Sequence, residues 1–140
     1  MIVAGKQKRE KNGPPPVPEE IEQQQLFVWT AYASGKWPEL DLLHHIPNGG
    51  KRSQTEAKRL KGQGVKAGVP DLCLPVARGG FHGLYIEMKR QGGTVSKEQS
   101  EWLQKLTRQG YLAAVCYGWE AAAKTMEDYL QEKVRAEKEG

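Results

Sequence analysis

The sequence predicts an α/β fold with a mixed central β-sheet flanked by α-helices. Two apolar runs at residues 72–76 and 84–88 enclose a glycine-containing stretch, which is typical of two antiparallel strands joined by a turn. An amphipathic segment follows and leads into a third apolar run at residues 111–117. This order predicts a strand–helix–strand crossover with parallel strands. Further helical patterns at both ends of the chain supply the covering layers.

The composition is that of one ordinary soluble domain. The 140 residues favour a single core, and 38% hydrophobic against 27% charged residues is a usual balance. The net charge of +4 favours a polyanionic partner. Cys73 and Cys116 lie inside apolar runs, which indicates buried reduced thiols and a cytoplasmic setting. The sequence shows neither a signal peptide nor an apolar run long enough to span a membrane.

Three parts follow one another along the chain. Residues 1–17 are polar, basic and rich in proline, which predicts a flexible arm, and residues 135–140 form a charged tail. Residues 18–134 hold the helix and strand patterns and form the predicted folded domain. The basic side chains of the arm either contact phosphate or remain solvated: Lys6, Lys8, Arg9 and Lys11.

The first predicted helix begins at Pro18 and runs to about residue 34, because proline and acids suit a first turn. Glu19 and Glu20 are expected to interact only with the helix dipole. The inward stripe contains apolar side chains and one acid: Leu26, Trp29, Ala33 and Glu22. That acid either pairs with a neighbouring arginine or belongs to a functional site, and the spacing leaves both alternatives open.

A first strand is expected over residues 40–46, ending at a turn over residues 47–50. His44 and His45 lie in this strand. Each of them either contacts phosphate, acts near a site, or packs as lone histidines more often do. The sequence does not choose among these roles.

A basic helix is predicted from Ser53 to about residue 62, with Glu56 completing a capping box and with Ala57 and Leu60 facing inward. A glycine-rich loop follows it and lets a polymer backbone approach closely. Six cations in this region are expected to hold DNA phosphates without reading bases: Lys51, Arg52, Lys58, Arg59, Lys61 and Lys66.

Two acids hold corresponding positions in the predicted hairpin. Asp71 and Glu87 are equidistant from Gly79, so a turn centred on Gly79 places them opposite each other. Paired residues on one face have Cβ atoms about 4.5–5.5 Å apart, at which distance two carboxylates repel. A divalent cation removes that repulsion. Mg²⁺ suits such a site because it prefers oxygen ligands and takes one or two carboxylates.

Two further polar residues have alternative roles. Lys89 shares the strand face of Glu87, where it can orient water or hold a phosphate oxygen, although acid-x-lysine triplets on open strand faces are usually solvated. Gln99 follows Ser96 at capping-box spacing in the next predicted helix. Gln99 therefore either serves only as a cap or also reaches the site.

The order of these features resembles the PD-(D/E)xK nuclease superfamily and, more narrowly, the VRR-NUC family. The resemblance extends from about Glu22 to Leu130. It rests on six stretches: Glu22-Gln23, His45-Ile46-Pro47-Asn48-Gly49-Gly50, Arg59-Leu60-Lys61, Gly64-Val65-Lys66-Ala67-Gly68-Val69-Pro70-Asp71-Leu72, Gly83-Leu84-Tyr85-Ile86-Glu87-Met88-Lys89 and Val115-Cys116-Tyr117-Gly118-Trp119-Glu120-Ala121.

The resemblance implies a restriction-endonuclease-like core and a role for each site residue. Asp71, Glu87 and the main-chain carbonyl of Met88 would bind Mg²⁺ or Mn²⁺, and Lys89 would help to activate water. Two others would have supporting roles: Glu22 would complete the acidic cluster directly or through water, and Gln99 would be an accessory residue. Small members of the family also imply a homodimer and branched DNA, such as Holliday junctions or flaps.

The resulting hypothesis is a Mg²⁺- or Mn²⁺-dependent DNA endonuclease in the cytoplasm of a bacterial or phage-infected cell. Its basic surface offers few base-reading groups, which favours recognition of DNA shape. Two alternatives remain at this point. One is a non-catalytic DNA-binding module with the same fold. The other is a partner-binding protein of a replication or packaging complex.

Overall fold

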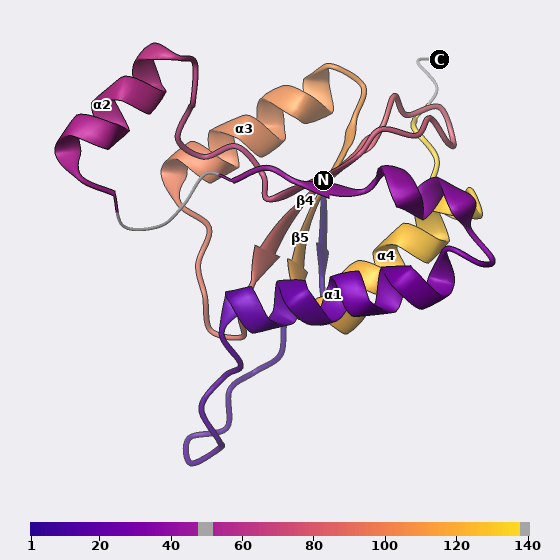
Figure 1. The fold of residues 1–140 in the computed structure, drawn as a ribbon. Coiled ribbons are helices and arrows are strands. Elements are labelled where there is room, and N and C mark those ends of the chain that lie inside the picture. Colours follow the sequence, from indigo (N-terminus) through magenta and orange to yellow (C-terminus); the bar gives the residue numbers. More distant parts are fainter. Residues whose placement is uncertain (48–51, 138–140) are drawn as a thin grey trace.

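The computed structural model describes residues 1–47 and 52–137 and contains one mixed five-stranded sheet, as the sequence predicts (Figure 1). The strand order is β1-β5-β4-β3-β2, where the strands are β1 (Ile2–Ala4), β2 (His44–His45), β3 (Leu72–Leu74), β4 (Leu84–Lys89) and β5 (Leu112–Tyr117). Strands β1, β5 and β4 run parallel, while β3 is antiparallel to β4 and to β2.

Four α-helices and one 3₁₀ helix surround the sheet: α1 (Glu19–Ala33), η1 (Pro38–Leu42), α2 (Gln54–Gly62), α3 (Lys97–Arg108) and α4 (Trp119–Leu130). None of the described helices is long and apolar enough to cross a membrane. Alternation along the central strands gives the sheet two buried faces. One face packs on α1 and α4 through Leu84, Ile86, Met88, Leu112, Ala114 and Cys116. The other packs Ala113, Val115 and Tyr117 on Leu103 of α3.

The predicted hairpin has the expected register. Leu72 pairs with Ile86 and Leu74 pairs with Leu84, so the next residues outward are Asp71 and Glu87. The turn depends on Gly79, which has a φ of +58° and leaves no room for a side chain beside the main-chain oxygen of Val134. The opposition of the two acids therefore follows from the strand pairing itself.

The segment after the hairpin also matches the prediction. Strands β4 and β5 are parallel neighbours, with Ile86 paired to Ala114 and Glu87 paired to Val115, and α3 connects them. The capping box of α3 is complete, because the Ser96 hydroxyl accepts from the Gln99 amide while the Gln99 side chain accepts from the Ser96 amide. Cys73 and Cys116 are free and buried, as expected.

The prediction of a flexible arm was wrong for the first residues. Ile2, Val3 and Ala4 form β1 and pair with residues 114–116 of β5. An unpaired edge strand exposes a row of backbone donors and acceptors, and this short apolar segment satisfies those of β5. The C-terminal tail is also attached in part, because Ala136 donates its amide to the carbonyl of Gly79.

Two expectations for residues 38–62 need correction. The predicted strand over residues 40–46 is mostly η1, and only His44 and His45 pair as strand. Pro38 at the helix start, followed by acids, favours a helical turn over a strand. Residues 48–50 of the predicted turn lie outside the described residues. Helix α2 begins after Ser53 as predicted, yet it stands apart from the sheet in Figure 1 and buries no residue: Ala57 is exposed and Leu60 is half-buried.

Candidate active site

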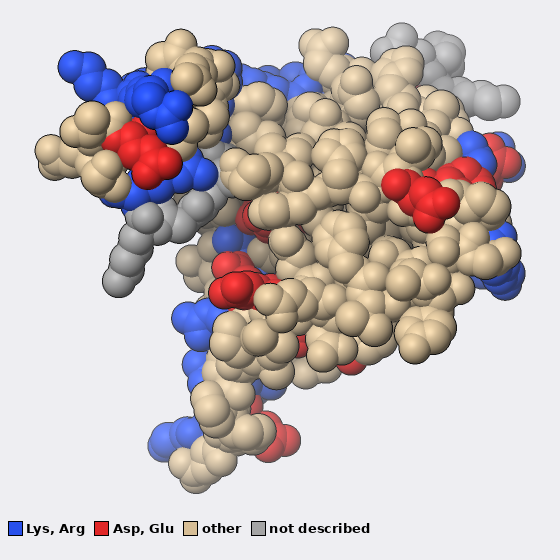
Figure 2. Space-filling model, viewed as in Figure 1, with Lys and Arg blue, Asp and Glu red and all other residues tan. Residues whose placement is uncertain are grey.

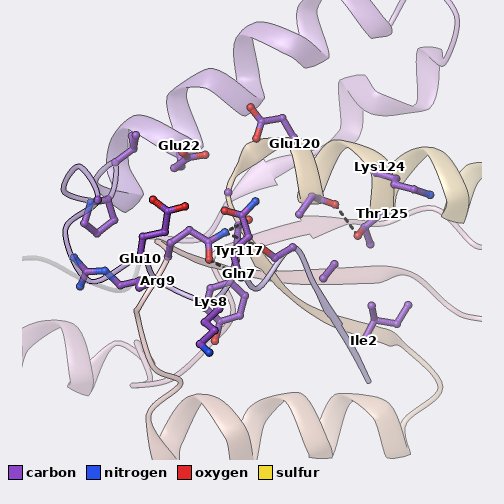
Figure 3. A pocket seen from close by; sticks show the side chains of 18 of the residues that line it. Ile2, Gln7, Lys8, Arg9, Glu10, Glu22, Tyr117, Glu120, Lys124 and Thr125 are labelled. Atoms are coloured by element: carbon purple, nitrogen blue, oxygen red, sulfur yellow. Dashed lines mark hydrogen bonds between the residues drawn. The ribbon is translucent and has the colours of Figure 1, made fainter.

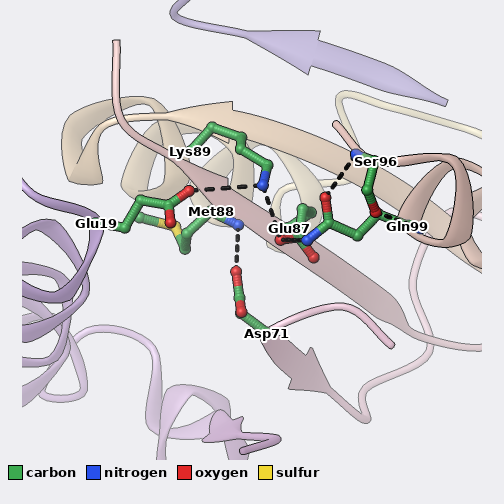
Figure 4. A network of polar contacts seen from close by, with 7 residues as sticks. All are labelled: Glu19, Asp71, Glu87, Met88, Lys89, Ser96 and Gln99. Atoms are coloured by element: carbon green, nitrogen blue, oxygen red, sulfur yellow. Dashed lines mark hydrogen bonds and ion pairs between the residues drawn. The ribbon is translucent and has the colours of Figure 1, made fainter. Parts of the chain in front are cut away.

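Three of the predicted site residues lie together beside the C-terminal part of β4 (Figure 4). Glu87 and Lys89 belong to this strand, and Asp71 directly precedes β3. The Oδ2 atom of Asp71 accepts a hydrogen bond from the Met88 amide at 2.8 Å. The strand register thus brings the predicted carboxylates and the lysine to one location.

Glu87 is a buried acid, with only 2% of its surface exposed. Its Oε1 atom accepts a hydrogen bond from Gln99 Nε2 at 2.9 Å and lies 3.6 Å from Lys89 Nζ. Its Oε2 atom is buried and, as an ionised carboxylate oxygen, accepts no hydrogen bond from the described residues. A buried carboxylate oxygen without a partner is costly, so this atom is suited to receive a cation or a proton.

The surroundings of Glu87 favour its protonated form when no metal ion is present. Burial, followed by the neighbouring Asp71 carboxylate, raises the pKa of Glu87 to about 9. Lys89 acts in the opposite direction and lowers this pKa. A hydrogen bond that the protonated Glu87 carboxyl donates to Asp71 raises it further, as does the charge of Glu19. The single positive charge of Lys89 therefore does not offset the burial of Glu87 and its repulsion by Asp71.

Lys89 lies between two carboxylates from different elements. Its Nζ atom is 3.6 Å from Glu87 Oε1 and also 3.6 Å from Glu19 Oε1, and its side chain is 9% exposed. An ammonium group has three donors, which allows it to contact two acids and a further oxygen. The lysine thus links the first turn of α1 to the carboxylate of β4.

Gln99 fills both of the roles that the sequence left open. Its Oε1 atom accepts from the Ser96 amide at 2.9 Å as part of the capping box, while its Nε2 atom donates to Glu87 Oε1 at 2.9 Å. One planar amide thereby joins the start of α3 to the site. Because the cap fixes the amide, the orientation of Glu87 is fixed with it.

Glu22 does not contact the site residues. Its Oε2 atom accepts a hydrogen bond from the Trp119 amide at 2.6 Å and caps α4, whose preceding residue Gly118 has no side chain to do so. Neither of the two alternatives for Glu22, an arginine partner or membership of the acidic cluster, describes this contact. The acid that α1 does bring to Lys89 is Glu19, which the sequence analysis assigned to the helix dipole alone.

A cleft of about 490 Å³ opens beside Asp71 and the first turn of α1. Its lining is Glu19, Glu20, Gln23, Gln24, His45, Pro47, Asp71 and Met88. His45 Nδ1 lies 2.9 Å from the main-chain oxygen of Asp71, whereas His44 Nδ1 lies 3.0 Å from the Leu42 oxygen in its own segment. The structure therefore places His45, but not His44, in this cleft.

The oxygen donors present fit a hard divalent cation. Within the described residues, no three His, Cys, Asp or Glu side chains form a ready-made metal cluster. Mg²⁺ needs no such cluster, because it usually binds through one or two carboxylates and keeps several waters. Asp71 and Glu87 would provide the two carboxylates, and the buried Oε2 of Glu87 would be one ligand atom.

The predicted DNA-binding cations gather around α2. Figure 2 shows basic side chains over this helix, and the described members of the set are all exposed: Arg52, Lys58, Arg59, Lys61 and Lys66. Lys51 lies outside the described residues. Because α2 stands away from the sheet and buries nothing, its surface is available to a polyanion.

Two comparisons with known proteins agree with this arrangement. The family model of the VRR-NUC domain matches residues 15–120, which include Asp71, Glu87 and Lys89. A solved structure of a VRR_NUC domain protein shares 32% sequence identity and has a TM-score of 0.73. The similarity covers 84% of this chain and 92% of that chain. No curated protein matches the sequence.

Proposed function

This chain belongs to the VRR-NUC family, whose domain has a nuclease-type fold, and we propose that the protein is a divalent-metal-dependent DNA endonuclease. The observation that most supports this proposal is the buried Oε2 of Glu87, which accepts no hydrogen bond from the described residues. It lies beside a second acid, Asp71, and a buried Lys89. Metal-assisted phosphodiester hydrolysis uses cation ligands and a fixed positive charge in this combination.

Asp71, Glu87 and the main-chain carbonyl of Met88 would hold Mg²⁺ or Mn²⁺. When bound, the ion supplies Lewis-acid stabilisation of the negative charge that develops at the phosphate. Gln99 keeps the Glu87 carboxylate in place through its hydrogen bond of 2.9 Å. A preorganised carboxylate loses little entropy when it binds, which favours binding of the ion.

Lys89 would orient the attacking water or hold a phosphate oxygen. Its contacts at 3.6 Å with Glu87 and Glu19 leave a donor for such an oxygen. In this proposal Glu19 would supply the α1 carboxylate that the resemblance assigned to Glu22. The roles of the other predicted residues are unchanged in this proposal.

Branched DNA, such as a Holliday junction or a flap, is the proposed substrate. The exposed cations around α2 can contact phosphates on any sequence, because phosphate contacts carry no base information. Selectivity would then come from DNA shape. A panel of labelled flaps, forks, junctions and linear duplexes tests this, and equal cleavage of all of them would contradict the preference for branches.

Nicking of supercoiled plasmid or a four-way junction in Mg²⁺ tests the nuclease activity. Asp71→Ala and Lys89→Ala should abolish nicking while DNA binding is retained. Matched controls are Asp128→Ala and Lys124→Ala, which remove one acid or one lysine from an exposed ion pair on α4. Both control variants should nick at the rate of the wild type.

Two outcomes would contradict the proposal. Wild-type protein that binds DNA but never nicks it would indicate a non-catalytic DNA-binding module. DNA binding without salt dependence would instead indicate a partner-binding protein of a replication or packaging complex, because phosphate contacts weaken steeply as salt rises.

We further propose that two copies act together in the cytoplasm of a bacterial or phage-infected cell. The outer side of α1 exposes Ile21, Val28 and Tyr32, which are 42%, 56% and 83% exposed and share one helix face. Sedimentation equilibrium measures the association directly. Tyr32→Glu should shift the protein toward the monomer, and a monomeric wild type would contradict the dimer.

A further inference from the structure

The loop formed by residues 5–17, here called the N-terminal loop, projects from the body between β1 and α1 (Figure 1). Most of it precedes the residues 15–120 that the family model matches, and the proposed function uses none of its side chains. It contains four exposed cations and one exposed carboxylate: Lys6, Lys8, Arg9, Lys11 and Glu10. The loop therefore carries a net positive charge within a short segment.

One end of the N-terminal loop is attached close to the active site by Gln91. The Gln91 Nε2 atom donates to the Gly5 carbonyl at 2.7 Å, and its Oε1 atom accepts from the Gln7 amide at 3.0 Å. The same Nε2 also reaches the Tyr117 carbonyl at 3.4 Å. Gln91 lies two residues beyond Lys89 in the sequence, so this attachment is at the rim of the site.

The other end of the loop returns to the same place. The chain passes through Pro14, Pro15 and Pro16 into α1, whose first residue Glu19 lies 3.6 Å from Lys89 Nζ. Consecutive prolines favour a stiff extended backbone. One end of the loop is therefore held by Gln91, two residues after Lys89, and the other end leads within two residues to Glu19, so the loop is not a free tail.

The loop's cations are available to a ligand. Within the described residues, none of the four forms an ion pair with a carboxylate, although Lys6 lies over the Tyr117 ring at 5.8 Å. Arg9 packs its side chain against Gly92. A cavity of about 840 Å³ separates the loop from α4, and Figure 3 shows Lys8 and Arg9 lying apart from Lys124 of that helix.

Two basic regions thus lie on different sides of the acidic site. Figure 2 shows blue side chains over α2 at the upper left and on the N-terminal loop at the lower left, with acidic side chains from the start of α1 between them. A DNA backbone that passes from one basic region to the other crosses the cleft beside Asp71. Positive charge on both sides of a scissile phosphate would hold the strand across the site.

We propose that the N-terminal loop is a second DNA-binding element, which contacts the phosphate backbone on the side of the active site opposite α2. This inference rests on the proposed function. Lys8, Arg9 and Lys11 would make the contacts, and Gln91 would act as a positioning residue that holds the loop beside the site. The contacts would bind any sequence, because they involve phosphates alone.

Fluorescence anisotropy of a labelled duplex in EDTA, measured over a range of salt concentrations, tests the proposal without cleavage. The double variant Lys8→Ala/Arg9→Ala should weaken binding and reduce the slope of log K against log salt by about 2, at about 0.9 for each lost phosphate contact. The matched control is Lys105→Ala/Arg108→Ala, which removes the same two residue types from the last turn of α3, at the other end of that helix from Gln99. It should keep the wild-type slope.

Gln91→Ala separates a held loop from a solvated one, because it leaves the charge unchanged. Gln91→Ala should also weaken DNA binding. If the loop acts only through its net charge, this variant will bind DNA with the affinity of the wild type, and that result would overturn the positioning role of Gln91. Equal slopes for the double variant and its control would overturn the proposal while the nuclease function stands. Wild-type protein that binds no DNA would overturn the proposed function and this inference together.

Discussion

At the scale of single residues, Glu87 concentrates the chemistry of the site. Burial and the nearby Asp71 raise its pKa to about 9, so the carboxyl holds a proton at neutral pH when no metal ion is bound. A divalent cation competes with that proton for the same oxygens. Metal binding and proton release are therefore expected to be coupled at this residue.

The pH dependence of stability follows from the same shift. The pKa of Glu87 rises from its ordinary 4.5 to about 9 on folding. As pH rises, the unfolded chain therefore loses the Glu87 proton at a lower pH than the folded protein does. Between these two pKa values the folded protein becomes less stable relative to the unfolded chain. In EDTA, the unfolding free energy should fall between pH 5 and pH 9, by up to about 1.4 kcal/mol per pH unit from this group. The melting temperature should fall over the same range. Glu87→Gln, which cannot ionise, should melt higher than wild type at the alkaline end. A fall equally steep in this variant would show that other groups cause it.

Proton release gives an independent measurement. Calorimetric titration of Mn²⁺ at pH 7.5, repeated in buffers of different ionisation enthalpy, should show close to one proton released per bound ion in the wild type. Glu87→Gln should bind Mn²⁺ more weakly and release no proton, with the fold intact. Unchanged Mn²⁺ affinity in this variant would contradict the role of Glu87 as a ligand.

At the scale of elements, the first turn of α1 carries two acids with different partners. Glu19 reaches Lys89 in the site, while Glu22, one turn later, caps α4 at the Trp119 amide. Glu22→Ala should therefore cost about 1–2 kcal/mol of unfolding free energy, as the loss of a good cap does, and leave Mn²⁺ affinity unchanged. Glu19→Ala should lower nicking with little effect on stability, because Glu19 is exposed. Thermal melting and the nicking assay test this pair of variants. A stable Glu22→Ala that nicks poorly, together with an unstable Glu19→Ala, would contradict the assignment.

Helix α2 depends on its own sequence for stability. It buries no residue, and its described stabilising features are local: the Ser53 cap at 3.1 Å and an exposed ion pair between Glu56 and Arg59 at 3.9 Å. Local helices without tertiary packing open easily. Amide hydrogen exchange should be faster in α2 than in α1 and α4, and bound DNA should slow it. Equal protection of all three helices in free protein would contradict this.

At the scale of the whole molecule, the strand and helix order followed from sequence where periodicity and turn chemistry agreed. The hairpin register was predictable because Gly79 fixes the turn and alternation fixes the faces. The capping box at Ser96 likewise marked the start of α3. Such signals depend on neighbours in the chain, which a sequence displays directly.

The features that sequence reasoning missed depend on distant contacts. Nothing in the segment Ile2–Ala4 reveals that the edge of β5 is free to pair with it. Similarly, helical spacing places Glu22 on the inward face but does not say which partner lies there, and the α4 amide of Trp119 is 97 residues away. Glu19 and Glu22 both fit the pattern of acids in the first turn of a helix. Only the packing of α1 across the sheet decides between them.

The role of β1 in closing the sheet gives the last prediction. Ile2 and Ala4 pack against the main core from one side of this strand, while Val3 points outward and is 55% exposed. Ile2→Lys should lower the unfolding free energy by about 1–3 kcal/mol, since it loses the burial of one large aliphatic side chain. For a chain of this length, that loss lowers the melting temperature by several degrees.

Val3→Lys makes a matching change on the exposed side of the same strand and should melt close to the wild type, so the pair separates burial from strand formation. Loss of β1 would also leave the backbone of β5 unpaired, and exposed edges of this kind associate with other chains. Ile2→Lys should therefore aggregate on heating more readily than Val3→Lys, which light scattering during the melt would record. Equal melting temperatures for the two variants would mean that the packing of Ile2 against the core contributes nothing to stability in solution.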